Sequence, residues 1–129
     1  MRWSWVPSVS PAWRAIPVAV VARTGLARVF GIVAAARLVL AADRAEASGA
    51  VAEALRFLRI AREYSEETEE VTDLIGRMGH LNYLHQSLEE AAPLLELAAQ
   101  RFRREGRRER ALAAQVEQID SLAQSAILP

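Results

Sequence analysis

The side chains that could perform acid–base or metal chemistry are few in this sequence, and their spacing does not suit it. His80 and His85 are the only two histidines and stand five residues apart. A metal-binding pair on one helix needs an i, i+4 spacing, so packing or polar surface roles are the better interpretation. The acids Glu66 and Glu70 fit the first turn of a helix, where the helix dipole favours negative charge. The sequence therefore predicts a protein that is not an enzyme and that needs no metal ion or cofactor.

Arginines between residues 101 and 110 form the one candidate site for phosphate binding. Arg104, Arg107 and Arg108 share a side there and would make a basic patch for nucleic acid. The zero formal net charge of the chain argues against bulk nucleic-acid binding. A solvated hairpin corner, or salt bridges to the acids of residues 63–73, explains the cluster more simply. Nucleic acid is therefore not the expected partner.

The composition indicates packed helices. Of the 129 residues, 52% are hydrophobic and only 6% are aromatic, and alternating strand-like stretches are absent. There is no cysteine, and all 16 basic residues are arginine, which excludes disulfides, thiolate metal sites and lysine Schiff-base chemistry. We expect one all-α domain in the cytoplasm.

The first 25 residues differ from the rest of the chain. They hold all three tryptophans, with Pro7 and Pro11 among them, and prolines at that density prevent a continuous helix. We expect residues 1–25 to be an irregular or disordered extension and residues 26–129 to be the helical domain. The apolar stretch that follows is interrupted by arginines, so no membrane span is expected. Its lack of acids would also suit a helix lying on a membrane surface.

The same pattern of small and large residues occurs twice, about 37 residues apart. Its two copies are Ala54-Leu58-Ala61 and Ala91-Leu95-Ala98. This spacing places the three residues of each copy on one helical face, with alanine where two backbones approach closely. Gly79 is expected at such a crossing too. Repeated helices that cannot bury their own apolar faces are typical of solenoids.

Capping and breaking residues predict where the helices begin and end. Ser87 and Glu90 match a capping box, Thr68 or Ser65 precedes an acid-rich first turn, and Gly106 is expected just after a helix end. The predicted helices cover residues 26–47, 50–64, about 68–83, 87–104 and 107–126. The last helix is expected to use as its apolar face Leu112, Val116, Ile119 and Leu122.

The body of the chain resembles tetratricopeptide repeats, in particular those of bacterial signalling ATPases and regulators. Met78-Gly79 is similar to the small pair late in that family's first helix, and Ala91, Leu95 and Ala98 are similar to its second helix. The resemblance covers about residues 30–126. It implies antiparallel helical hairpins stacked as a short right-handed solenoid, and it implies a protein–protein interaction module that works as a scaffold or adaptor.

The resemblance also implies which residues bind. In that family the first helices of successive repeats line a concave groove that holds a peptide or a partner helix. Tyr83 would be an anchor there, since tyrosine buries a large area and keeps a polar tip. The residues placed in the groove are Asp43, Glu46, Asp73, Gly76, His80, Tyr83, Leu84, Glu117, Ser121 and Gln124.

Two other functions stay open. The chain could be a fragment or relative of the helical sensor region of a transcriptional regulator, with contact to nucleic acid through Arg104, Arg107 and Arg108. It could also self-associate through apolar repeat ends that no terminal capping helix covers.

Overall fold

The computed structural model describes residues 25–66 and 68–127, and every regular element in these ranges is an α-helix. The all-α prediction is therefore confirmed for the described residues. The predicted irregular extension lies outside them, except for Gly25, which begins the first helix. The helices are α3 (Gly25–Ala47), α4 (Val51–Tyr64), α5 (Glu69–Leu84), α6 (Leu88–Arg104) and α7 (Arg108–Ile127).

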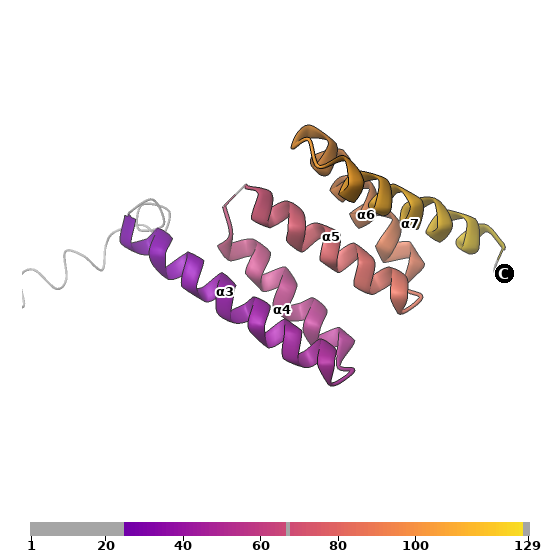
Figure 1. Cartoon of the computed structure of the whole chain (residues 1–129). Helices are drawn as coiled ribbons and strands as arrows, with labels where there is room; N and C mark the ends of the chain where they lie inside the picture. Colours follow the sequence, from indigo (N-terminus) through magenta and orange to yellow (C-terminus); the bar gives the residue numbers. More distant parts are fainter. Residues whose placement is uncertain (1–24, 67, 128–129) are drawn as a thin grey trace, which may run out of the picture.

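The helices pack mainly against their neighbours in the chain. α3 and α4 form one hairpin, α5 and α6 form another, and α7 lies along α6 and also contacts α5 (Figure 1). The contact between α4 and α5 joins the two hairpins. Because each helix covers mainly the next one, the faces of α3 and α7 that point away from these neighbours are left open to solvent.

Tight turns with left-handed backbone angles end two of the helices where the sequence predicted a break. Gly49 follows α3 with a φ of 80°, and Gly106 follows α6 with a φ of 76°. After α6, the Arg107 amide donates a hydrogen bond of 2.8 Å to the Phe102 carbonyl oxygen. This hydrogen bond closes the helix end in the manner of a Schellman motif, which favours glycine because other residues are strained at positive φ.

The helix starts agree with the sequence in position but only partly in mechanism. Thr68 is the N-cap of α5, and its side chain accepts a hydrogen bond from the Glu70 amide. Ser87 is the N-cap of α6, but its side chain makes no capping hydrogen bond. The predicted capping box is therefore wrong in its hydrogen bonding, because the backbone alone forms this turn, with the Ser87 amide bonded to the Asn82 carbonyl oxygen.

The repeated small and large residues form the core, as predicted. Leu58 and Leu95 are fully or almost fully buried, at 0% and 1% exposure. The predicted alanines Ala54, Ala61, Ala91 and Ala98 all have 0% exposure. A β-carbon built at Gly79 would lie 2.9 Å from Leu95 Cδ2, so α5 and α6 approach closely only because this position has no side chain.

The predicted apolar face of the last helix is not buried. Leu112, Val116, Ile119 and Leu122 are all more than half exposed. α7 instead packs through Ala111, Ala114 and Ser121. Small residues, which carry little apolar signal in the sequence, allow the close packing of α7 against the other helices and leave its apolar face exposed.

α3 also exposes apolar side chains. Leu26 and Phe30 have the largest exposed fractions, 67% and 65%, and Val29, Val33 and Leu40 are exposed as well. Among the described residues, α3 alone is long and apolar enough to cross a bilayer by length and composition. Core helices of soluble proteins and signal sequences meet the same criterion.

Candidate functional site

α5 and α7 run side by side in a fixed register of 37 residues. His80 Nδ1 lies 2.7 Å from Glu117 Oε2, and the Tyr83 hydroxyl donates a 2.5 Å hydrogen bond to Asp120. The third contact at this spacing joins Asp73 to Arg110 across 3.6 Å. Gln124, one turn beyond Asp120, donates a hydrogen bond of 2.8 Å to the same carboxylate. The predicted residues His80, Tyr83, Glu117 and Gln124 therefore lie together on one seam.

The environment of Tyr83 stabilises its neutral form. The hydrogen bond to Asp120, partial burial and the negative charges of Asp120 and Glu117 all raise the pKa of the Tyr83 phenol above its ordinary value. The phenol therefore stays protonated through the physiological range. It donates its proton to the carboxylate of its own chain, so its hydroxyl already has a partner.

A second ion-pair cluster joins α3 to α5. Arg77 on α5 pairs with Asp43 and, at 2.8 Å, with Glu46, both on α3. Burial lowers the pKa of the Arg77 guanidinium, but the hydrogen bonds to the two carboxylates more than offset this effect and the pKa ends raised. Asp43 and Glu46 were predicted to face a partner, and they hold Arg77 instead.

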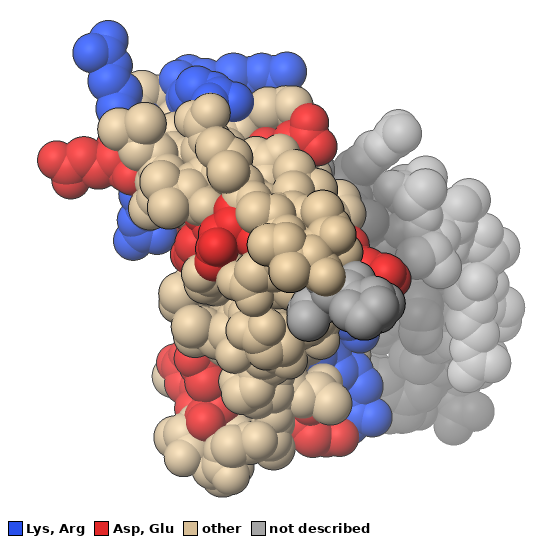
Figure 2. All heavy atoms as spheres, turned by 90° about the vertical axis from the view of Figure 1, so that its right-hand side faces the viewer, with Lys and Arg blue, Asp and Glu red and all other residues tan. Residues whose placement is uncertain are grey.

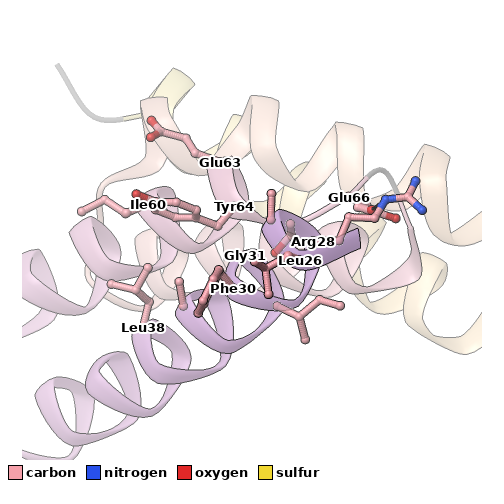
Figure 3. A pocket seen from close by; sticks show the side chains of 13 residues that line it. Leu26, Arg28, Phe30, Gly31, Leu38, Ile60, Glu63, Tyr64 and Glu66 are labelled. Atoms are coloured by element: carbon pink, nitrogen blue, oxygen red, sulfur yellow. Dashed lines mark ion pairs between the residues drawn. The ribbon is translucent and has the colours of Figure 1, made fainter. Parts of the chain in front are cut away.

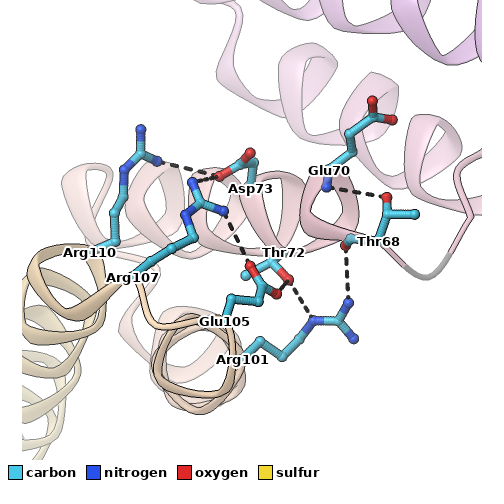
Figure 4. A network of polar contacts seen from close by, with 8 residues as sticks. All are labelled: Thr68, Glu70, Thr72, Asp73, Arg101, Glu105, Arg107 and Arg110. Carbon is cyan, nitrogen blue, oxygen red and sulfur yellow. Dashed lines mark hydrogen bonds and ion pairs between the residues drawn. The ribbon is translucent and has the colours of Figure 1, made fainter.

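A third cluster joins α5 to the turn between α6 and α7 (Figure 4). Arg107 pairs with Asp73 at 2.5 Å and with Glu105 at 3.3 Å, and its guanidinium lies 4.8 Å from the centre of the Phe102 ring. Glu105 accepts a 2.5 Å hydrogen bond from the Thr72 hydroxyl. The hydrogen bond to Asp73 raises the pKa of Arg107 despite the opposing effect of burial. Of the arginines between residues 101 and 110, Arg107 and Arg110 thus pair with an acid of residues 63–73, namely Asp73.

We expect Arg107→Gln to lower the free energy of unfolding by about 1–2 kcal/mol, because it removes a partly buried, hydrogen-bonded charge between α5 and the turn. Urea denaturation followed by circular dichroism measures this loss. The matched control is Arg108→Gln, at the next residue, which is exposed and should change stability by less than about 0.5 kcal/mol. Equal losses in the two variants would show that Arg107 contributes no more than a surface charge.

A first hollow lies beside the first turns of α3. It measures about 930 Å³ and is lined by apolar side chains of α3 and by the end of α4, including Phe30, Ile60 and Tyr64 (Figure 3). The Arg28–Glu66 ion pair of 2.9 Å stands at its edge.

A second hollow of about 540 Å³ lies between α3 and α5. The α3 wall is apolar, with Ile32, Val39 and Leu40 among its residues. The α5 wall is charged and consists of Glu70, Asp73 and Arg77 around Leu74. A neighbouring hollow shares Ile32 and Glu70 with it and adds Glu66 and Glu69. One apolar wall thus faces a mainly acidic one.

Most of the predicted groove residues lie on the face formed by α3, α5 and α7, but only Asp73 lines this hollow. Leu84 is exposed at the end of α5. Two predicted residues point elsewhere. A β-carbon at Gly76 would meet Phe102 of α6 at 3.1 Å, and Ser121 is fully buried with its hydroxyl bonded to the Glu117 carbonyl oxygen. Both face the protein interior because helix packing requires small residues there.

Sequence reasoning missed Arg77, Asp120 and the apolar wall of α3. Asp120 was accessible from the sequence, since it stands 37 residues after Tyr83, which is the spacing of the repeated core pattern. The role of Arg77 could not be predicted in this way, because its partners on α3 lie 34 and 31 residues away, outside the 37-residue register.

The predicted basic patch is divided in the structure. Arg107 turns towards Asp73 and Glu105, while Arg104 and Arg108 stay exposed. Figure 2 shows several basic side chains at the top of the molecule with acidic ones near them, and further basic side chains near its lower right, with uncharged surface over much of the rest of that view. Of the three arginines, Arg107 is thus already bound to two carboxylates of its own chain.

The histidines and acids do not assemble a metal centre in the described ranges, where no group of three or more candidate ligand side chains occurs. His80 faces one carboxylate, that of Glu117.

Comparison with known proteins gives no relative: no family model, no curated protein and no solved structure matches the chain.

Proposed function

We propose that this protein is a binding module that holds an amphipathic, basic segment of a partner protein between α3 and α5. The observation that supports this function is the 540 Å³ hollow with an apolar wall on α3 and a charged wall on α5. Binding sites for peptides combine apolar surface, which supplies affinity, with a few charged groups, which set orientation.

The charge of the hollow defines the chemistry of the partner. Glu69 and Glu70 are exposed at its edge. Two other acids of this region already have partners, since Glu66 pairs with Arg28 and Asp73 pairs with Arg107. The cation in its wall, Arg77, is already paired with Asp43 and Glu46. The remaining negative charge favours lysine or arginine on the partner and disfavours acidic peptides.

The stacking of tetratricopeptide-like hairpins is part of the same proposal. It is supported by the 37-residue register, which relates Ala54, Leu58 and Ala61 to Ala91, Leu95 and Ala98, all buried to within 1% exposure. The same register relates His80 to Glu117 and Tyr83 to Asp120 across α5 and α7. In such a stack α3, α5 and α7 form one face, on which the hollow lies.

The test uses two synthetic peptides that form amphipathic helices with leucine on one face and either lysine or glutamate on the other. We expect the full chain to bind the fluorescently labelled lysine peptide in an anisotropy titration and to bind the glutamate peptide at least about tenfold more weakly. Leu40→Ser removes part of the apolar wall and should raise the dissociation constant about tenfold. Leu40 is 55% exposed, so this change leaves the fold intact.

A matched pair of variants tests the charged wall of the hollow. Glu70→Gln should weaken binding of the lysine peptide, whereas Glu89→Gln on the exposed side of α6 should not. Equal affinity for both peptides, or an unchanged affinity in Leu40→Ser, would contradict the proposed site. A short DNA duplex serves as a third probe, and its preferential binding would favour the alternative regulator-like function.

A further inference from the structure

The outer face of α7 corresponds to faces of α3 and α5 that lie inside the protein. At the 37-residue spacing, Val116 on α7 corresponds to Gly79 on α5 and to Ala42 on α3. Ala42 has 0% exposure, and Gly79 is buried against Leu95 of α6. Val116, in contrast, is 65% exposed. α4 follows α3 and packs against it, and α6 does the same for α5. In the described chain no helix follows α7 to cover its corresponding face.

The neighbouring positions show the same difference. Leu112 and Ile119 correspond to Ile75 and Asn82, which have 0% and 4% exposure. On α7 the exposed fractions are 62% for Leu112 and 58% for Ile119, and Leu122 adds a further 53%. These four residues follow one another at helical spacing, so they form one apolar stripe on one side of α7. We refer to Leu112, Val116, Ile119 and Leu122 as the α7 stripe.

Charge decides which kind of surface the α7 stripe fits. Between Ala111 and Ile127 the only charged residues are Glu117 and Asp120, and both turn towards α5, where they meet His80 and Tyr83. Nucleic acid and anionic membranes bind where arginine or lysine lies along the contact. Here arginines flank only the Leu112 end, where Arg103 and Arg108 lie, and no basic residue lies between Ala111 and Ile127. When a second copy of α7 packs on the α7 stripe, no charges of the same sign lie opposite each other between Ala111 and Ile127.

We infer that two copies of this chain pair through the α7 stripe, with their α7 helices antiparallel about a twofold axis. An isologous contact requires a self-complementary surface, and an uncharged apolar stripe meets that condition. In this arrangement Val116 of one copy lies opposite Ile119 of the other, and Leu112 lies near the partner's Leu122. Specific interfaces bury at least roughly 1,200 Å², and one helix pair of this length lies at that lower limit, so we expect a weak dimer with a dissociation constant on the order of micromolar.

This inference is independent of the α3–α5 hollow, because the α7 stripe faces away from α5. Sedimentation equilibrium of the full chain over a range of concentrations around the micromolar should fit a monomer–dimer equilibrium. Ile119→Glu and Val116→Lys each place a charge in the contact and should each raise the dimer dissociation constant at least about tenfold. Both positions are exposed in the monomer, so circular dichroism should show unchanged helix content.

Mixing the two variants tests the twofold geometry. Since residue 119 of one copy lies opposite residue 116 of the other, the mixture should form a heterodimer that neither variant forms alone. Phe30→Glu on α3 is the matched control, because Phe30 is equally exposed at 65% but lies on another helix, and it should leave the dimer unchanged. A wild-type chain that stays monomeric, a dimer dissolved by Phe30→Glu but not by the α7 variants, or a mixture without heterodimers would each overturn the inference.

Discussion

Leu95→Ala should lower the free energy of unfolding by about 2–5 kcal/mol. Leu95 is 1% exposed and fills the space above Gly79. Because Gly79 has no side chain, nothing on α5 can move into the cavity. Urea denaturation followed by circular dichroism measures the loss, which is a large share of the stability of a domain of this size.

Two further variants make this prediction specific. Leu84→Ala removes the same atoms from the end of α5, where the side chain is 53% exposed, and should cost less than about 0.5 kcal/mol. Leu95→Met keeps the volume and should cost less than about 1.5 kcal/mol. If Leu95→Ala were no worse than Leu84→Ala, the close contact between α5 and α6 would be wrong.

Ala91→Leu should cost about 1–3 kcal/mol through overpacking. Ala91 has 0% exposure and stands one turn before Leu95 on the buried face of α6. A larger side chain there forces α6 away from the core. The fall in thermal midpoint, followed by circular dichroism, measures this effect.

The control for this change is Ala52→Leu, an exposed alanine on α4. Leucine and alanine have similar helix propensities, so Ala52→Leu should leave the midpoint nearly unchanged. An unchanged midpoint in Ala91→Leu as well would contradict the repeat register at that position.

Much of the fold was accessible from the sequence because local signals agreed with one another. The spacing of Ala91, Leu95 and Ala98 indicated the buried face of α6, and Gly106 indicated its end, where the backbone φ is indeed positive. Helix periodicity and the need for glycine at positive φ are local properties. For this reason the five helices lie within about two residues of their predicted bounds.

The candidate site was harder to predict from the sequence than the fold. Asp43 and Glu46 were assigned to a partner on the basis of helix position, but the structure pairs both with Arg77. Sequence position indicates which face a charge lies on, but not whether a charge on another helix already neutralises it. The hollow between α3 and α5 depends in the same way on the distance between helices that are not adjacent in the chain.

The last helix, α7, also shows what the sequence determines and what only the tertiary structure decides. The sequence by itself determined that Leu112, Val116, Ile119 and Leu122 share one side of a helix, because that follows from 3.6 residues per turn. Only the tertiary structure decided that this side is exposed, since α7 packs through Ala111, Ala114 and Ser121 instead. Apolar periodicity shows which face of a helix is apolar, but that face is buried only if a neighbouring helix lies against it. The described chain provides no helix after α7.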